Sequence, residues 1–134
     1  MAEKKKDPAQ LTALQAQLLE VLWLRGEATA SEARSALSET VPLAITTVST
    51  LLVRMLRFGW VEREKQGREY VYRPVVTRKQ VQAAKVSGLL ESMFKKDLVS
   101  FVSHALAAED WEPGDIERLN ALLAAHGEEV EPDE

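Results

Sequence analysis

Leucine and valine residues recur at helical spacing near the start of the chain and predict a first amphipathic helix over Leu11 to Arg25. Thr12 followed by Gln15 has the form of a capping box, in which each residue satisfies a backbone group at the start of the helix. Gly26 is expected to end the helix. The apolar stripe consists of Leu11, Leu14, Leu18, Val21 and Leu22.

Two further helices are predicted before residue 60. A short helix that is polar on one side is expected over Glu32 to Ser38, with Thr29 or Ser31 as its cap. A third helix is expected from about Ala44 to Arg57, because apolar residues again recur at helical spacing and Phe58-Gly59 interrupts the pattern. Its apolar stripe consists of Val48, Leu51, Leu52, Met55 and Leu56.

After residue 59 the pattern changes from helical to strand-like. Aromatic and β-branched residues over 60–64 and 69–74 flank a glycine-containing turn at 65–68, which predicts a β-hairpin. Three helices followed by a hairpin is the order of a winged helix-turn-helix.

Beyond the hairpin, three amphipathic helices are predicted over 77–94, 97–108 and from Pro113 to Gly127, where Gly127 is expected to stop the last one. We therefore expect a mainly α protein with a small β-hairpin wing: a winged helix-turn-helix domain plus a C-terminal helical dimerisation domain. The predicted divisions are a flexible N-terminus (1–9), the winged-helix domain (10–76), the C-terminal helical domain (77–126) and an acidic flexible tail (127–134).

The composition is that of a folded protein, with 46% hydrophobic and 28% charged residues. The chain contains no cysteine, which excludes disulfides, thiolate metal sites and cysteine nucleophiles. No segment approaches the roughly 20 apolar residues of a membrane helix, and the N-terminus does not resemble a secretory signal, so we expect a cytoplasmic protein with no membrane association.

The net charge of −4 hides an uneven distribution. Residues 1–75 carry 11 Lys and Arg against 9 Asp and Glu, whereas residues 76–134 carry 6 against 12. Within 46–79 there are eight basic and three acidic residues, and this local excess is typical of a nucleic-acid-binding surface.

The exposed face of the third helix carries hydroxyl and guanidinium groups and no carboxylate. Such side chains can bond phosphates and base edges when a helix enters the major groove, and Arg54 is the first candidate for a base contact because its fork can span two acceptors of guanine. An ordinary polar helix face is the alternative. The candidate residues are Thr46, Thr47, Ser49, Thr50, Arg54 and Arg57.

Two cations near the hairpin turn, Lys65 and Arg68, are expected to contact flanking phosphates, although surface turns are often charged for solubility alone. Ser31, at the start of the second helix, is a further candidate for contact with the DNA backbone. Tyr70 and Tyr72 share one strand face, and packing within the hairpin is favoured over base stacking.

The helices beyond residue 77 have more apolar surface than they can bury alone, because a winged-helix core is complete near residue 75. A symmetric partner would cover this surface, so we expect a twofold dimer. The expected interface consists of Leu89, Leu90, Met93, Phe94, Leu98, Phe101, Val102, Leu106, Ile116, Leu119, Leu122 and Leu123.

No catalytic constellation is visible, and the two histidines, His104 and His126, lack companions at metal-ligand spacing. We therefore expect no enzyme activity, no metal and no cofactor.

The segments LTALQAQLLEVLW and TTVSTLLVRMLRFGWVEREKQGREYVYRPVV resemble the first helix, recognition helix and wing of the BlaI/MecI-type penicillinase-repressor family over almost all of residues 10–76. The stretch from Thr46 to Arg54 is the most specific part. The resemblance implies a repressor that binds a dyad operator as a homodimer, with DNA-facing roles for Thr46, Thr47, Thr50 and Arg54 and wing roles for Lys65 and Arg68. Leu43 and Ala44 depart from the aromatic and hydroxyl pair common before the recognition helix.

In the β-lactam branch of that family, a membrane sensor triggers proteolysis of the repressor at an Asn-Phe bond. The resemblance therefore implies control of antibiotic-response genes and a sensor-linked protease as a partner. His104-Ala105 occupies the corresponding position here, so the cleavage motif is not matched. The copper-responsive branch uses C-terminal cysteines, and their absence excludes copper sensing by that route.

Two other functions are compatible with the same pattern. A winged-helix module could dock its third helix on an acidic protein, or the basic face could bind DNA without regard to sequence. The strength of the salt dependence and the preference for operator over random duplex distinguish these alternatives.

Overall fold

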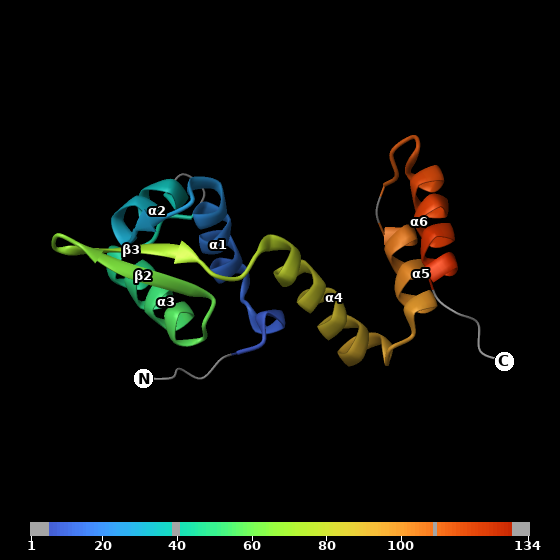
Figure 1. Cartoon of the computed structure of the whole chain (residues 1–134), viewed down its shortest axis with the longest axis horizontal. Coiled ribbons are helices and arrows are strands. Elements are labelled where there is room, and N and C mark those ends of the chain that lie inside the picture. Colours follow the sequence, from blue (N-terminus) through green and yellow to red (C-terminus); the bar gives the residue numbers. More distant parts are fainter. Residues whose placement is uncertain (1–5, 39–40, 109, 130–134) are drawn as a thin grey trace. The chain divides into compact units, whose positions relative to one another are not determined.

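A computed structural model describes residues 6–38, 41–108 and 110–129, with side chains given as far as Gly127. The chain separates into two compact units, Met1–Met93 and Phe94–Glu134 (Figure 1). The prediction divided the chain after Val76, so the structure groups the helix that follows with the first unit. None of the described helices is long and apolar enough to cross a membrane.

The first unit begins with the 3-10 turn η1 (Pro8–Gln10) and helix α1 (Ala13–Arg25). The predicted capping box of α1 is confirmed: the Thr12 hydroxyl accepts from the Gln15 amide at 3.2 Å, and the Gln15 side chain accepts from the Thr12 amide at 2.9 Å. Gly26 ends the helix with a φ of 87°, a conformation that residues other than glycine rarely adopt.

Helix α2 (Ala30–Leu37) begins two residues before the predicted start, because Thr29 provides its capping box together with Glu32. Ser31 is therefore an exposed residue of the first turn and not the cap. Just before the helix lies β1 (Ala28–Thr29), a strand that the sequence did not predict because two residues show no periodicity.

Helix α3 (Ile45–Arg57) agrees with the predicted third helix and is followed by the hairpin of β2 (Val61–Gln66) and β3 (Glu69–Pro74). The strands form an antiparallel sheet of order β1-β3-β2. Lys65 pairs with Tyr70 inside the ladder, so the turn is shorter than predicted and consists of Gly67 and Arg68. Gly67 has a φ of 67°, as the first position of a type II′ turn requires.

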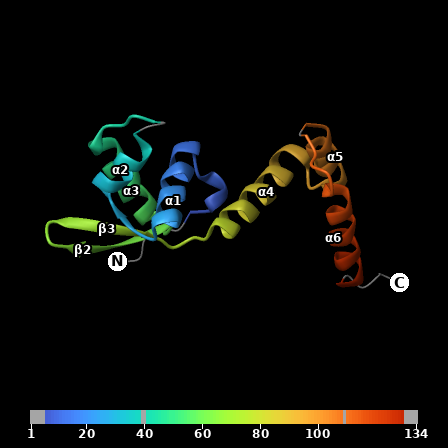
Figure 2. The same cartoon turned by 90° about the horizontal axis from the view of Figure 1, so that it is seen from above.

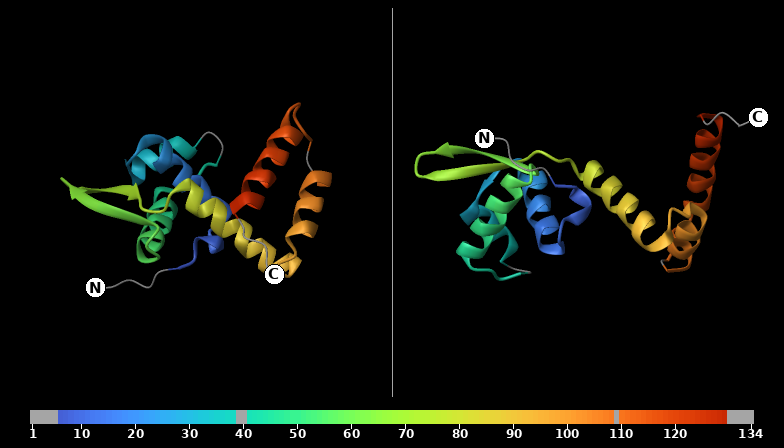
Figure 3. Two further views of the ribbon diagram at one scale, coloured as in Figure 1. Left: turned by 45° about the vertical axis from the view of Figure 1, so that its right-hand side comes forward. Right: turned by 90° about the horizontal axis from the view of Figure 1, so that it is seen from below.

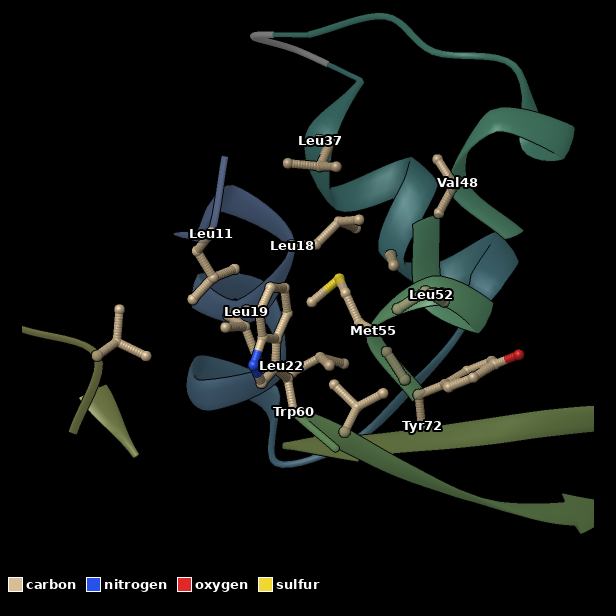
Figure 4. Packing of buried hydrophobic residues seen from close by; sticks show 14 residues of the cluster. Leu11, Leu18, Leu19, Leu22, Leu37, Val48, Leu52, Met55, Trp60 and Tyr72 are labelled. Atoms are coloured by element: carbon tan, nitrogen blue, oxygen red, sulfur yellow. The ribbon is translucent and has the colours of Figure 1, made fainter. Parts of the chain in front are cut away.

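Helices α1, α2 and α3 lie on one face of this sheet (Figure 2). Their apolar stripes meet the inner sides of the strands in a single core, whose centre Figure 4 shows. Trp60 is 1% exposed and donates its indole N–H to the Lys6 carbonyl at 2.8 Å. The largest fully buried side chains are Trp60, Leu18, Leu19, Leu22, Leu52, Met55 and Val48.

Residues 6–9 were predicted to belong to a flexible N-terminus, but in the structure they are bonded to the core. Besides the bond from Trp60, the Lys6 amide donates to the Phe58 carbonyl at 3.1 Å, and Asp7 caps η1. Lys4 and Lys5, which precede Lys6 in the sequence, lie outside the described residues.

Helix α4 (Arg78–Phe94) follows the sheet and begins with a further capping box formed by Thr77 and Gln80. Val81 is the buried residue of this helix. The Trp23 indole of α1 donates to the Val76 carbonyl at 2.9 Å, which attaches the segment just before α4 to α1.

The second unit contains α5 (Leu98–Ala108) and α6 (Asp115–Glu129), joined by a turn in which Gly114 has a φ of 94°. Phe94 contacts Phe101 edge to face at 5.3 Å. The prediction that Gly127 stops the last helix is wrong, since α6 continues to Glu129. The remainder of the predicted acidic tail, 130–134, lies outside the described residues.

Candidate nucleic-acid interface

Helix α3 has two chemically distinct faces. Val48, Leu52 and Met55 are completely buried, which fixes the rotation of the helix against α1, α2 and the sheet. The polar positions between them point away from the core as the sequence predicted. Thr46, Thr47, Thr50, Arg54 and Arg57 are exposed, and Ser49 is half-buried.

Four of the predicted residues surround one shallow depression along the exposed side of α3. Thr46, Thr47, Thr50 and Arg54 line it together with Leu51. The structure therefore brings together hydroxyl groups and one guanidinium over two turns of a single helix. This is the length of helix that a major groove accommodates, and the N-terminal residues of a recognition helix are those that contact base edges.

A second depression connects α3 with the start of α2 and with the hairpin. Ser31 and Ser49, which the sequence placed on different helices, both line it. The other lining residues are Ala30, Ile45, Glu69, Tyr70 and Tyr72. The depression thus joins three elements into one surface.

Ile45 is a candidate that the sequence did not reveal. It is the first residue of α3, lies beside Ser31 and Ser49, and is 38% exposed. Its spacing from Val48 and Leu52 would assign it to the buried stripe, so periodicity gave no signal for an exposed position. An apolar group on this surface can contact the methyl group of thymine.

Two arginines of the basic segment 46–79, Arg63 and Arg73, stabilise the hairpin itself. The Arg63 guanidinium lies 3.7 Å from the Tyr70 ring centroid and donates to the Tyr72 hydroxyl at 3.1 Å. Arg73 bonds Glu64 at 3.0 Å and Glu27 at 2.9 Å. These bonds with Glu64 and Glu27 raise the pKa of Arg73 above its usual value, and they hold the guanidinium between two acids.

Arg78 likewise bonds Glu20 of α1 and stacks over the Trp23 ring at 5.0 Å. Among the described residues, no carboxylate pairs with Arg54, Arg57, Lys65 or Arg68, and all four are exposed. Arg54 and Arg57 on α3 and Lys65 and Arg68 on the hairpin are therefore cations that can attract phosphates.

Tyr70 and Tyr72 are hairpin residues, in agreement with the prediction. Tyr72 is buried in the core and Tyr70 is the platform for Arg63, with Lys65 also near its ring. Neither ring is therefore a free stacking surface.

The predicted dimerisation residues fall into two groups. Phe94, Phe101 and Leu106 are half-buried by contacts within the second unit, including the edge-to-face contact of the two rings, and Leu90 of α4 is half-buried as well. The more exposed members are Leu89, Met93, Leu98, Val102, Ile116, Leu119, Leu122 and Leu123. Leu98, Val102 and Leu123 line one open apolar depression in the second unit, together with Leu106 and Trp111.

Three helices over a sheet, a polar cationic face on the third helix and a hairpin beside it define a winged helix-turn-helix DNA-binding protein. The sequence model of the penicillinase repressor family matches residues 11–125, and the chain belongs to that family of DNA-binding transcriptional repressors.

Individual relatives agree with this assignment. The penicillinase repressor of Bacillus licheniformis is 25% identical over 122 residues, which cover 91% of this chain and 94% of that protein. The DNA-binding domain of the repressor BlaI is 28% identical, with a TM-score of 0.51 over 57% of this chain and 92% of that domain. The structure of the hsRosR-S4 complex has a TM-score of 0.52 over 93% of this chain and 96% of that one; at 20% identity this match shows the fold alone.

Proposed function

We propose that the protein binds a dyad operator as a homodimer and represses transcription, with α3 in the major groove of each half-site. The observation that carries this proposal is the separation of faces on α3, where every exposed polar side chain is a hydroxyl or a guanidinium. The proposed groove contacts are Thr46, Thr47, Ser49, Thr50, Arg54 and Arg57.

Backbone contacts would come from the elements on either side of α3. Arg68 occupies the tip of the hairpin and Lys65 lies in the second ladder pair from the turn, opposite Tyr70, so both cations can reach phosphates beside the groove. Ser31 lines the same depression as Ser49, and its hydroxyl can donate to a phosphate at the opposite edge. These contacts would fix the position of the domain on the duplex without reading bases.

The proposed dimer covers the apolar residues that the chain leaves exposed on α4, α5 and α6. Met93 of the first unit is 70% exposed and Leu123 of the second unit is 68% exposed, and exposed apolar residues that gather on either unit commonly mark an interface. Twofold symmetry would present two α3 helices to half-sites separated by about one helical turn of DNA, roughly 10 base pairs, or a multiple of it. Such a repressor would act in the cytoplasm.

We extend the proposal to antibiotic-response genes and to release of repression by a sensor-linked protease, as membership of the family suggests. His104-Ala105, at the position of the cleaved bond in the β-lactam branch, lies within helix α5, and His104 bonds the Ser100 carbonyl at 2.8 Å. Cleavage there would require α5 to unwind locally, because a protease acts on transiently opened segments.

The test is selection of bound sequences from random duplex DNA by the purified protein at about 150 mM salt, close to physiological ionic strength. A twofold symmetric motif is the expected result. If the dimer neutralises about eight phosphates, the logarithm of the binding constant should fall with the logarithm of salt concentration with a slope of about −7.

Two results would contradict the proposal. Equal affinity for the selected and random duplexes would identify a sequence-independent DNA binder. Absence of DNA binding, together with a stoichiometric complex with an acidic protein, would identify a protein-interaction module.

A further inference from the structure

A glycine stands in the middle of α4, where it weakens the helix and where DNA binding gives it no role. The structure supplies a reason for Gly88. A Cβ atom at this position would stand 3.1 Å from the Cβ of Ala9 in η1, closer than ordinary contact. The glycine therefore permits the N-terminal turn to lie directly against α4, as Figures 1 and 3 show.

Lys85 precedes Gly88 by three residues on α4, and it also contacts the N-terminal segment that contains η1. Its ammonium group donates to the Ala9 carbonyl at 2.9 Å and also to the Leu11 carbonyl. Val81, four residues before Lys85, is 7% exposed and belongs to the core of the first unit. Val81, Lys85 and Gly88 thus follow one face of α4, and that face is turned toward η1 and the core.

The other end of the same segment is attached to the end of α3. The Lys6 amide donates to the carbonyl of Phe58, which is the residue that caps α3, and the Trp60 indole donates to the Lys6 carbonyl. The Lys6 ammonium lies 4.5 Å from the centroid of the Phe58 ring. Residues 6–11 therefore connect the C-terminal end of α3 to the middle of α4.

We propose that residues 6–11 form a brace that sets the position of α4 relative to α3, with Lys85 and Gly88 as positioning residues for binding to two half-sites. The inference rests on the proposed dimer. Helix α4 carries Leu89, Leu90 and Met93 of the proposed interface immediately after Gly88. A fixed α4 would hold the two α3 helices of a dimer at one separation, which selects one half-site spacing.

The test compares Gly88→Val and Lys85→Met with matched controls on the same helix, Ser87→Val and Lys79→Met. Each protein is measured on the symmetric duplex recovered by selection, on duplexes with one to four base pairs inserted at its centre, and on a single half-site. Amide hydrogen exchange at Lys6 and Leu11 reports whether the brace has detached, and exchange in α1 reports whether the domain is still folded.

We expect both brace variants to bind the half-site within about twofold of the parent, because residues that face DNA are untouched. Affinity for the symmetric duplex should fall at least about tenfold, and the preference for one spacing should weaken, while the controls match the parent. Exchange at Lys6 and Leu11 should accelerate without a change in α1.

An unchanged spacing profile in variants with a detached brace would overturn the inference, as would unchanged exchange at Lys6 and Leu11 in Gly88→Val. Failure of the proposed function would give a different result. If the protein did not bind a dyad operator as a dimer, the parent protein itself would bind the symmetric duplex no better than the half-site.

Discussion

Arg54 lies on the exposed side of α3. No carboxylate among the described residues pairs with its guanidinium. We predict that Arg54→Ala lowers affinity for the selected duplex by about 1 to 3 kcal/mol, the usual contribution of a bidentate contact with guanine, and relaxes the preference at one base pair. Competition binding with single-base variants of the duplex measures both effects.

The matched control is Arg25→Ala, which removes an exposed guanidinium from the end of α1, where it faces Glu32 at 3.8 Å. This variant should bind like the parent. Full discrimination by Arg54→Ala would remove Arg54 from base recognition.

Ile45 offers a test of a different kind of base contact. Replacing a thymine by uracil in one half-site removes only a methyl group, and we predict that one such replacement weakens binding of the parent. In Ile45→Ala the same replacement should have no further effect, because the apolar partner of the methyl is gone. Additive losses in this double-mutant cycle would show that Ile45 does not contact a thymine.

At the scale of elements, the hairpin is expected to supply affinity without specificity. Replacing both Lys65 and Arg68 by alanine should weaken binding uniformly across sequences. It should also make the salt slope of the dimer shallower by about 3.6, since the two subunits together lose four phosphate contacts at about 0.9 each. Binding titrations at several salt concentrations measure the slope. A change confined to one base pair would instead indicate that the hairpin reads sequence.

The sequence predicted the longer elements well because their signals are local. Helices α1 and α3 combine an apolar stripe with a cap or a glycine, and the hairpin has strand periodicity around Gly67. The two-residue strand β1 carries no such signal, because its pairing with β3 depends on residues more than 40 positions away.

The candidate site was also only partly visible in the sequence. The apolar stripe of α3 determines which side of the helix faces the core, so the exposed hydroxyl-bearing face could be predicted from the sequence. The roles of Arg63 and Arg73 were not, because their partners lie across the hairpin and in the link before α2. Counting charges along the chain treats all cations as equal, whereas the structure separates those that hold the hairpin from those that remain exposed.

At the scale of the whole molecule, the proposed dimer predicts that exposed leucines differ in importance according to the unit that carries them. Leu123→Asp should produce a monomer in analytical ultracentrifugation, since it places a charge in the apolar depression of the second unit. Because Leu123 is exposed, helical content by circular dichroism should be retained.

Leu24 supplies the control for this prediction, since it is 76% exposed on α1 of the first unit. Leu24→Asp should remain dimeric. A dimer that persists in Leu123→Asp would place the interface elsewhere.

The two faces of α3 have no residue in common: Val48, Leu52 and Met55 hold the domain together, and the residues proposed to meet DNA are not among them. A mutation on the DNA-facing side is therefore expected to have little effect on folding, and selection for stable folding would hardly act against it. Descendants of a duplicated gene could acquire a new target by changing Thr46, Ser49 or Thr50 while retaining the ancestral fold. The same independence would allow an experimenter to redirect the protein to a chosen promoter without first having to restore its folding.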